Sequence, residues 1–172
     1  MLTPDQEKYL LTIPPDKLAR LQPFDPVVRH AAEQIIVQIK EAVPGLEVFF
    51  GGASALGIAG QNDIDLNVLS SPLEYAKYLP ALSATFGPPA RQNPNLVKWE
   101  FSRDGFDVEL YLTDRDSGSL REQIRTFELL RDKPKLREEY ERLKLVCNGL
   151  PLREYMRQKY EFFNKILKKE SA

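Results

Sequence analysis

The sequence predicts an α+β fold in which helices pack on a small mixed sheet. Apolar residues recur at helical spacing over residues 26–43 and in three later segments near the C-terminus. Four short segments between these helices have the pattern of strands, and the turn Asp104-Gly105 joins two of them as a hairpin. A chain of 172 residues with 42% hydrophobic residues is the size of one such domain with a proper core.

Proline, glycine and helix-capping residues set the expected ends of the helices and strands. Asp25-Pro26 announces the first long helix, and Pro44-Gly45 ends it. Ser71-Pro72 starts another helix, which is expected to bend or stop near Pro80. The predicted strands cover residues 46–50, 64–68, 96–102 and 106–113, and the three C-terminal helices cover 119–131, 134–147 and 151–169. Residues 1–24 are predicted to form an N-terminal arm with a short helix, and residues 25–172 a single domain.

Charge and cysteine content restrict the classes of function. Basic and acidic residues number 24 and 25, so the net charge is −1 and argues against extended nucleic-acid binding or membrane attachment. Any anionic substrate must therefore be held by a local patch. The single cysteine, Cys147, excludes an internal disulfide. No apolar run reaches membrane-spanning length, and residues 1–6 do not resemble a signal peptide, so we expect a cytoplasmic protein.

A glycine turn followed by an acidic strand is the most informative feature. Gly51 and Gly52 end a strand and allow close approach of the backbone to a ligand, and Ser54 adds a hydroxyl near exposed amides. Asp63 and Asp65 are two residues apart on the next strand, so both side chains point to one face. Paired carboxylates repel each other unless a cation neutralises them, and hard oxygen ligands suit Mg²⁺ or Mn²⁺. Separately, each element is more often a plain turn or a solvated strand face; together they indicate a nucleotide site.

A third carboxylate is expected on the strand over residues 106–113. Asp107 and Glu109 share one face of this strand, opposite Phe106 and Val108. Asp107 is the first choice for a third metal ligand, and Glu109 is the close alternative. The plain interpretation is that both carboxylates simply face water.

These residues resemble the nucleotidyltransferase superfamily, which includes DNA polymerase beta. That superfamily carries a glycine turn at a strand end, Asp-x-Asp about ten residues later, and a third carboxylate on a later strand. Within it, the chain looks most like the GrpB family over residues 21–168. The matching segments are Gly51-Gly52-Ala53, Gly57-Ile58-Ala59, Ile64-Asp65-Leu66, Leu129-Leu130-Arg131-Asp132-Lys133-Pro134, Tyr140-Glu141-Arg142-Leu143-Lys144 and the run from Tyr155 to Phe163.

The resemblance also has departures. Gly52 replaces the usual serine, Asp63 stands where relatives often have an apolar residue, and residues 106–112 are acidic where relatives tend to carry histidine. In its C-terminal part, the resemblance implies that Lys144, Tyr155 and Lys159 contact a nucleotide. Lys159 follows Tyr155 by four residues, so both lie on one helix face. From spacing alone, solvated or snorkelling lysines are the commoner outcome.

The sequence thus predicts a metal-dependent nucleotidyltransferase that moves a nucleoside monophosphate from a nucleoside triphosphate to an unidentified hydroxyl acceptor. Asp63, Asp65 and Asp107, or Glu109 in its place, would hold the metal. Gly51, Gly52 and Ser54 would cradle phosphates, and Lys144 and Lys159 would draw charge toward pyrophosphate. The alternative is a non-catalytic nucleotide-binding or protein-interaction module that kept the fold. An accessory role in coenzyme A metabolism is implied by family analogy only.

Overall fold

The computed structural model describes residues 1–170, so the last two residues of the predicted domain, 171–172, lie outside the described residues. A five-stranded mixed sheet with the order β1-β2-β5-β4-β3 forms its centre. β2 and β5 run parallel, and every other neighbouring pair is antiparallel. The strands are β1 (Glu47–Gly51), β2 (Ile64–Ser70), β3 (Arg91–Asn93), β4 (Leu96–Arg103) and β5 (Phe106–Asp114).

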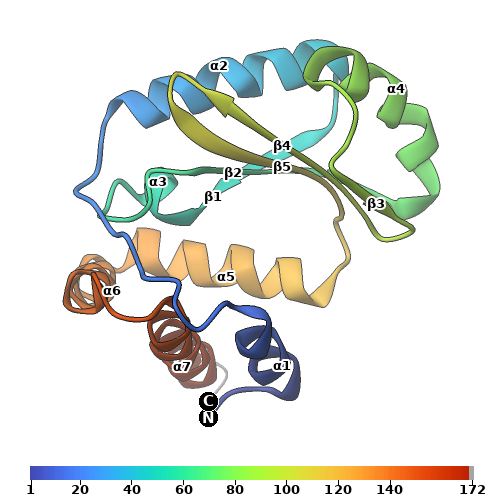
Figure 1. The fold of residues 1–172 in the computed structure, drawn as a ribbon. Helices are drawn as coiled ribbons and strands as arrows, with labels where there is room; N and C mark the ends of the chain where they lie inside the picture. Colours follow the sequence, from blue (N-terminus) through green and yellow to red (C-terminus); the bar gives the residue numbers. More distant parts are fainter. Residues whose placement is uncertain (171–172) are drawn as a thin grey trace.

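Helices cover the sheet from two sides (Figure 1). α2 (Val27–Ala42) and α4 (Tyr75–Phe86), which follows the short 3₁₀ turn η1 (Pro72–Glu74), lie over one face. The other side carries α5 (Gly118–Asp132), α6 (Pro134–Cys147) and α7 (Leu152–Glu170), with α1 (Pro4–Thr12) beside α7. The short α3 (Gly52–Leu56) follows β1 directly. This arrangement confirms the predicted α+β class.

Alternation along the strands explains why the α2 and α4 side forms the main core. On that face, the central residues of β2, β4 and β5 are apolar and at most 1% exposed, namely Ile64, Leu66, Val68, Val97, Trp99, Val108, Leu110 and Leu112. α2 adds its own apolar stripe at helical spacing. The shared core includes Ile35, Ile39, Ile64, Leu66, Val68, Leu82, Val97, Trp99, Val108, Leu110 and Leu112.

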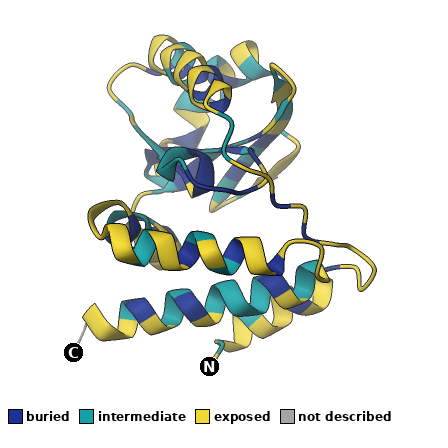
Figure 2. Ribbon diagram, turned by 90° about the vertical axis from the view of Figure 1, so that its left-hand side faces the viewer, coloured by how far each residue is buried: buried dark blue, intermediate teal, exposed yellow. Residues whose placement is uncertain are grey.

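The lower helices have their own, smaller apolar clusters. Tyr140, Phe162 and Ile166 join α6 to α7, and Ala53 of α3 packs on the same cluster. Figure 2 shows that the outer sides of these helices are mainly exposed while their inward sides are buried. The helical layer is therefore held to the sheet mostly through α5 and α3. No helix among residues 1–170 has the length and apolar character needed to cross a membrane.

Two local expectations differ from the structure. α4 continues through Pro80 to Phe86 instead of stopping near the proline, which lies on the exposed side of the helix. Apolar contacts of Tyr75 and Leu82 with the core hold the helix on both sides of the missing hydrogen bond. The short edge strand β3 was not predicted, because its polar sequence has no strand pattern and only pairing with β4 defines it.

Candidate functional site

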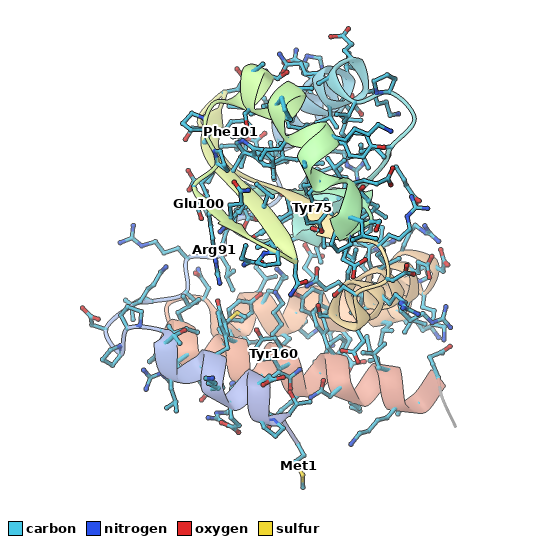
Figure 3. All side chains as sticks on the ribbon, turned by 90° about the vertical axis from the view of Figure 1, so that its right-hand side faces the viewer. Met1, Tyr75, Arg91, Glu100, Phe101 and Tyr160 are labelled. Atoms are coloured by element: carbon cyan, nitrogen blue, oxygen red, sulfur yellow. The ribbon has the colours of Figure 1, made fainter. Side chains whose placement is uncertain are left out.

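A cavity of about 730 Å³ lies between the helices α5, α6, α7 and α1 and the face of the sheet that is opposite α2 and α4. Most of the side chains predicted from sequence to bind a nucleotide line it. Its lining includes Gly51, Gly52, Asp63, Asp65, Glu109, Lys144, Tyr155 and Lys159. A second hollow of about 300 Å³ between α5, α6 and α7 contains none of them. Figure 3 views the molecule with the sheet, carrying Arg91 and Glu100, above the helical layer that carries Tyr160.

The glycine turn is built around Asp65. Gly52 has a φ of 76°, a left-handed conformation that side chains other than glycine rarely adopt. A Cβ atom at this position would lie 2.7 Å from Oδ2 of Asp65, which is closer than real contacts allow. Glycine is therefore required here both by the backbone and by the close approach of the Asp65 carboxylate. Gly52, which stands where related sequences usually have serine, thus lacks a hydroxyl but leaves room for the Asp65 carboxylate.

Ser54 does not reach the cavity. Its side chain is 1% exposed, and its hydroxyl donates a 2.6 Å hydrogen bond to the backbone carbonyl of Asp63. From its place after the glycine turn, the amide or hydroxyl of Ser54 was expected to face a phosphate. The buried bond instead fastens α3 to the segment that presents Asp63, because a buried hydroxyl must find a partner inside the protein.

The strand register decides which carboxylates meet. Asp65 of β2 is directly opposite Glu109 of β5 and, on its other side, Gly51 of β1. Asp107 lies on the same face as Glu109 but is exposed, at the far end of the strand, where its carboxylate is 3.5 Å from the hydroxyl of Ser102. Of the two candidates for the third carboxylate, only Glu109 lines the cavity. Glu109 therefore takes the place of Asp107 as the preferred third carboxylate. The parallel pairing of β2 with β5 starts at Ile64 and Val108, and this register sets Glu109 beside Asp65.

Burial dominates the electrostatics of Asp65. It raises the pKa of this carboxyl group to about 7, and the negative charges of Asp63 and Glu109 act in the same direction. The ammonium groups of Lys159 and Lys144 act in the opposite direction. Near neutral pH, Asp65 is thus poised between its two protonation states, which is common at functional sites.

The carboxylate of Glu109 is paired with neighbouring side chains, which keep it ionised. Its Oε1 accepts a 2.7 Å bond from Nζ of Lys98, and its Oε2 accepts a 2.6 Å bond from the hydroxyl of Tyr111. Burial alone would raise the pKa of Glu109, but these two bonds and the positive charge of Lys98 hold it below the ordinary value. Lys98 also pairs with Glu100. Both oxygens of the third carboxylate are therefore already engaged.

Two lysines and two tyrosines face the acidic strand from α6 and α7. Lys144 is 5% exposed, and its ammonium nitrogen lies 4.9 Å from the ring centre of Tyr140 and 5.8 Å from that of Tyr155. Burial lowers the pKa of Lys144, whereas for Lys159 the nearby Tyr155 and Asp65 outweigh burial and raise the pKa. Among the residues that the structure describes, these two lysines are the only basic ones that line the cavity.

The carboxylates allow a direct test of the metal hypothesis. Among residues 1–170, no three or more His, Cys, Asp or Glu side chains are grouped so that they could hold a metal ion. With Glu109 engaged by Lys98 and Tyr111, a centre made of three protein carboxylates does not fit. Asp63 and Asp65 remain, and two carboxylates suit a Mg²⁺ ion that completes its coordination with phosphate oxygens and water. The predicted ligand set of Asp63, Asp65 and Asp107 therefore contracts to the first two.

Some residues in and around the site were not anticipated from the sequence. Lys98 could have been found, because the Asp104-Gly105 turn fixes the hairpin register and sets Lys98 directly opposite Tyr111. Tyr111 is two residues from Glu109 on the same face of β5, so Lys98 is close to both side chains. Tyr140 had no local signal beyond its place in a segment that resembles the family. Tyr9 and Gln6 of the N-terminal helix carried no local signal, because only the tertiary fold brings them to the cavity.

The fold of the chain is nucleotidyltransferase-like. It superimposes on Cid1, described as having RNA terminal uridylyl transferase activity, with a TM-score of 0.53 and 15% identity over 81% of this chain and 43% of that one. A Cid1 poly(U) polymerase structure with bound MgGTP gives a TM-score of 0.50 and 17% identity over 81% and 44%. A CdnE c-di-GMP synthase from Capnocytophaga granulosa gives 0.40 and 20% over 55% and 36%. The chain thus spans less than half the length of these proteins.

The chain belongs to the GrpB family, whose model, described as GrpB protein, matches residues 19–169. The family assignment made from the sequence is confirmed. No curated protein is significantly similar to this chain in sequence.

Proposed function

We propose that this protein binds a nucleoside triphosphate in the cavity between the sheet and the helical layer and transfers its nucleotidyl group to a hydroxyl acceptor. One observation carries the proposal: Asp63 and Asp65 face the same cavity as Lys144 and Lys159, below the glycine turn. Lysine is a good point-charge partner for phosphate, and these two are the only basic residues lining the cavity among those described. The triphosphate therefore belongs beside them.

The chemistry follows from the charges on the two walls. The acceptor oxygen would form a bond to the α-phosphorus while the bond from that phosphorus to the bridging oxygen breaks, and the hydroxyl proton is released to solvent. Pyrophosphate leaves with the electron pair of the broken bond, and Lys144 and Lys159 offset its charge. Asp63 and Asp65 would hold a Mg²⁺ ion brought in with the nucleotide, which would supply electrostatic stabilisation of the phosphates. An RNA end, a protein hydroxyl or a small molecule could serve as acceptor.

Calorimetric titration with ATP, GTP, CTP and UTP in the presence of Mg²⁺ tests binding. Lys159→Met should weaken nucleotide binding by about tenfold to a hundredfold, because it removes a charged hydrogen-bond donor. Lys168→Met is the matched control, since Lys168 is exposed on the same helix and does not line the cavity. Equal effects of the two substitutions, or no binding by the unmodified protein, would refute the site.

A non-catalytic nucleotide-binding module is the second candidate, and the engagement of Glu109 by Lys98 and Tyr111 favours it. Turnover separates the two candidates. Incubation with α-labelled nucleoside triphosphates, Mg²⁺ and a set of acceptors should transfer label and release pyrophosphate if the protein is an enzyme. Tight binding without label transfer to RNA ends, proteins or small hydroxyl compounds would favour the module.

A further inference from the structure

The N-terminal helix α1 lies outside the segment matched by the family model, which begins at residue 19. It nevertheless forms part of the cavity wall, because Thr3, Asp5, Gln6 and Tyr9 all line the cavity. In Figure 1, α1 lies beside α7 and below the first half of α5. This chain therefore completes its cavity with an element that the family match does not include.

α1 is fastened to α7 by side chains on both helices. Gln6 and Asn164 form a reciprocal amide pair, with donor–acceptor distances of 3.1 Å and 2.9 Å. Glu7 accepts two bonds from the guanidinium of Arg157, at 3.0 Å and 3.3 Å. The rings of Tyr9 and Tyr160 meet edge to face with centres 6.3 Å apart. Three separate contacts thus hold α1 in place as a wall.

The charges that line the cavity are unevenly distributed. Both basic lining residues, Lys144 and Lys159, are on the part of α6 and α7 that faces Asp63 and Asp65. The end formed by α1 and the start of α5 instead has Asp5 and Glu122. Neither carboxylate makes a hydrogen bond or an ion pair with any of residues 1–170. An ionised carboxylate only accepts hydrogen bonds, so this end disfavours phosphate and favours an uncharged group with N–H donors.

The two ends are within the span of one nucleotide. Asn164 follows Lys159 by five residues on α7, which is a rise of about 7.5 Å. Asn164 holds Gln6, and Asp5 is the preceding residue of α1. A nucleotide whose phosphates lie at Lys159 can therefore place its base near Asp5, beside the rings of Tyr9 and Tyr160.

We propose that α1 is the specificity element of this site: Asp5 and Tyr9 form a subsite for the nucleobase that selects bases with an exocyclic amino group. The amino group would donate to the Asp5 carboxylate, while Tyr9 contacts the ring. Uracil has no exocyclic amino group, and its one N–H donor on this edge, N3–H, is flanked by two carbonyl oxygens that repel a carboxylate. The inference rests on the proposed nucleotide site and adds its selectivity.

Calorimetric titration of the full chain with ATP, UTP and inorganic tripolyphosphate tests this subsite. The unmodified protein should bind ATP at least about tenfold more tightly than UTP, because a charged hydrogen bond is gained in one and lost in the other. Asp5→Asn should reduce this ratio toward one while tripolyphosphate binding stays constant. Asp16→Asn is the matched control, since it makes a carboxylate-to-amide change in the same N-terminal segment at an exposed residue that does not line the cavity and does not hold α1 to α7.

A second variant keeps the test independent of the charge. Tyr9→Ala should weaken ATP binding but not tripolyphosphate binding. An unchanged ATP to UTP ratio in Asp5→Asn, or equal binding of ATP and UTP by the unmodified protein, would overturn the role of α1 and leave the nucleotide site standing. If none of the three ligands binds, the nucleotide site itself fails, and the subsite fails with it.

Discussion

The two faces of the sheet use the same strands for different purposes. On the face under α2 and α4, Leu66 of β2 and Leu110 of β5 are fully buried in an apolar core. On the opposite face, the preceding residues of the same strands, Asp65 and Glu109, line a polar cavity. The core face is closed by close packing, whereas the cavity face carries charges that are only partly compensated.

This difference teaches that stability and function are separated by a single step along each strand. Because side chains alternate between faces, adjacent residues such as Leu110 and Tyr111 can be substituted independently. The core face tolerates little change in volume. The cavity face contains a half-buried carboxylate, Asp65, whose ionisation works against folding.

Removal of core volume should give the largest effect. Leu110→Ala should lower the free energy of unfolding by about 2–5 kcal/mol, because Leu110 is fully buried between the sheet and its helices. Tyr111→Phe, one residue further on the other face, should cost less, about 1.5–3 kcal/mol, the value of one hydrogen bond to a charged group. Urea denaturation measures both. Similar losses in the two variants would contradict the separation of the faces.

Asp65→Asn should stabilise the protein in a pH-dependent manner. The pKa of Asp65 is raised in the folded state from 3.8 to about 7, so the folded protein holds a proton that the unfolded chain has lost between these values. The stability of the unmodified protein, relative to the variant, should therefore fall as pH rises from about 4 to about 7 and then level off, by on the order of a few kcal/mol. Denaturation curves from pH 4 to 8 measure this. A variant less stable at every pH would show that Asp65 accepts essential hydrogen bonds.

Gly52→Ala should cost more stability than Gly45→Ala. Both glycines have positive φ angles, so each substitution carries a backbone cost of about 1 kcal/mol. Only at Gly52 would the new Cβ also collide with Asp65, whereas nothing lies within 4 Å at Gly45. Thermal melts of the two variants should differ accordingly. Equal melting temperatures would mean that the Asp65 carboxylate is free to move away.

Lys98→Met should have the smallest effect. The pair between Lys98 and Glu109 is partly exposed, so its loss should cost about 1 kcal/mol or less at pH 7. Because this pair lowers the pKa of Glu109 in the folded state, its contribution is present above the ordinary carboxyl value and lost as pH falls through the folded value. The two proteins should thus converge in stability at acidic pH. A difference that persists at the lowest pH at which both proteins still fold would indicate lost packing instead of lost charge.

The site was only partly predictable, and Ser54 and Glu109 show why. A hydroxyl two residues after Gly52 is a reasonable phosphate ligand from local sequence, but packing of α3 turns it toward the Asp63 carbonyl. Asp107 and Glu109 are equivalent by alternation alone. Only the pairing of β2 with β5 distinguishes them. That pairing sets Asp65 opposite Glu109, which is 44 residues later in the sequence.

The sequence by itself determined the fold class, the family, the glycine turn and the Asp63 and Asp65 pair, because alternation, helical periodicity and turn chemistry act over a few residues. The tertiary structure alone decided that Glu109 faces Asp65 and that Lys144 and Lys159 face the acidic strand. It also decided that α1 closes the cavity. These are contacts between distant segments, and they are fixed by strand register and helix packing that no local pattern records.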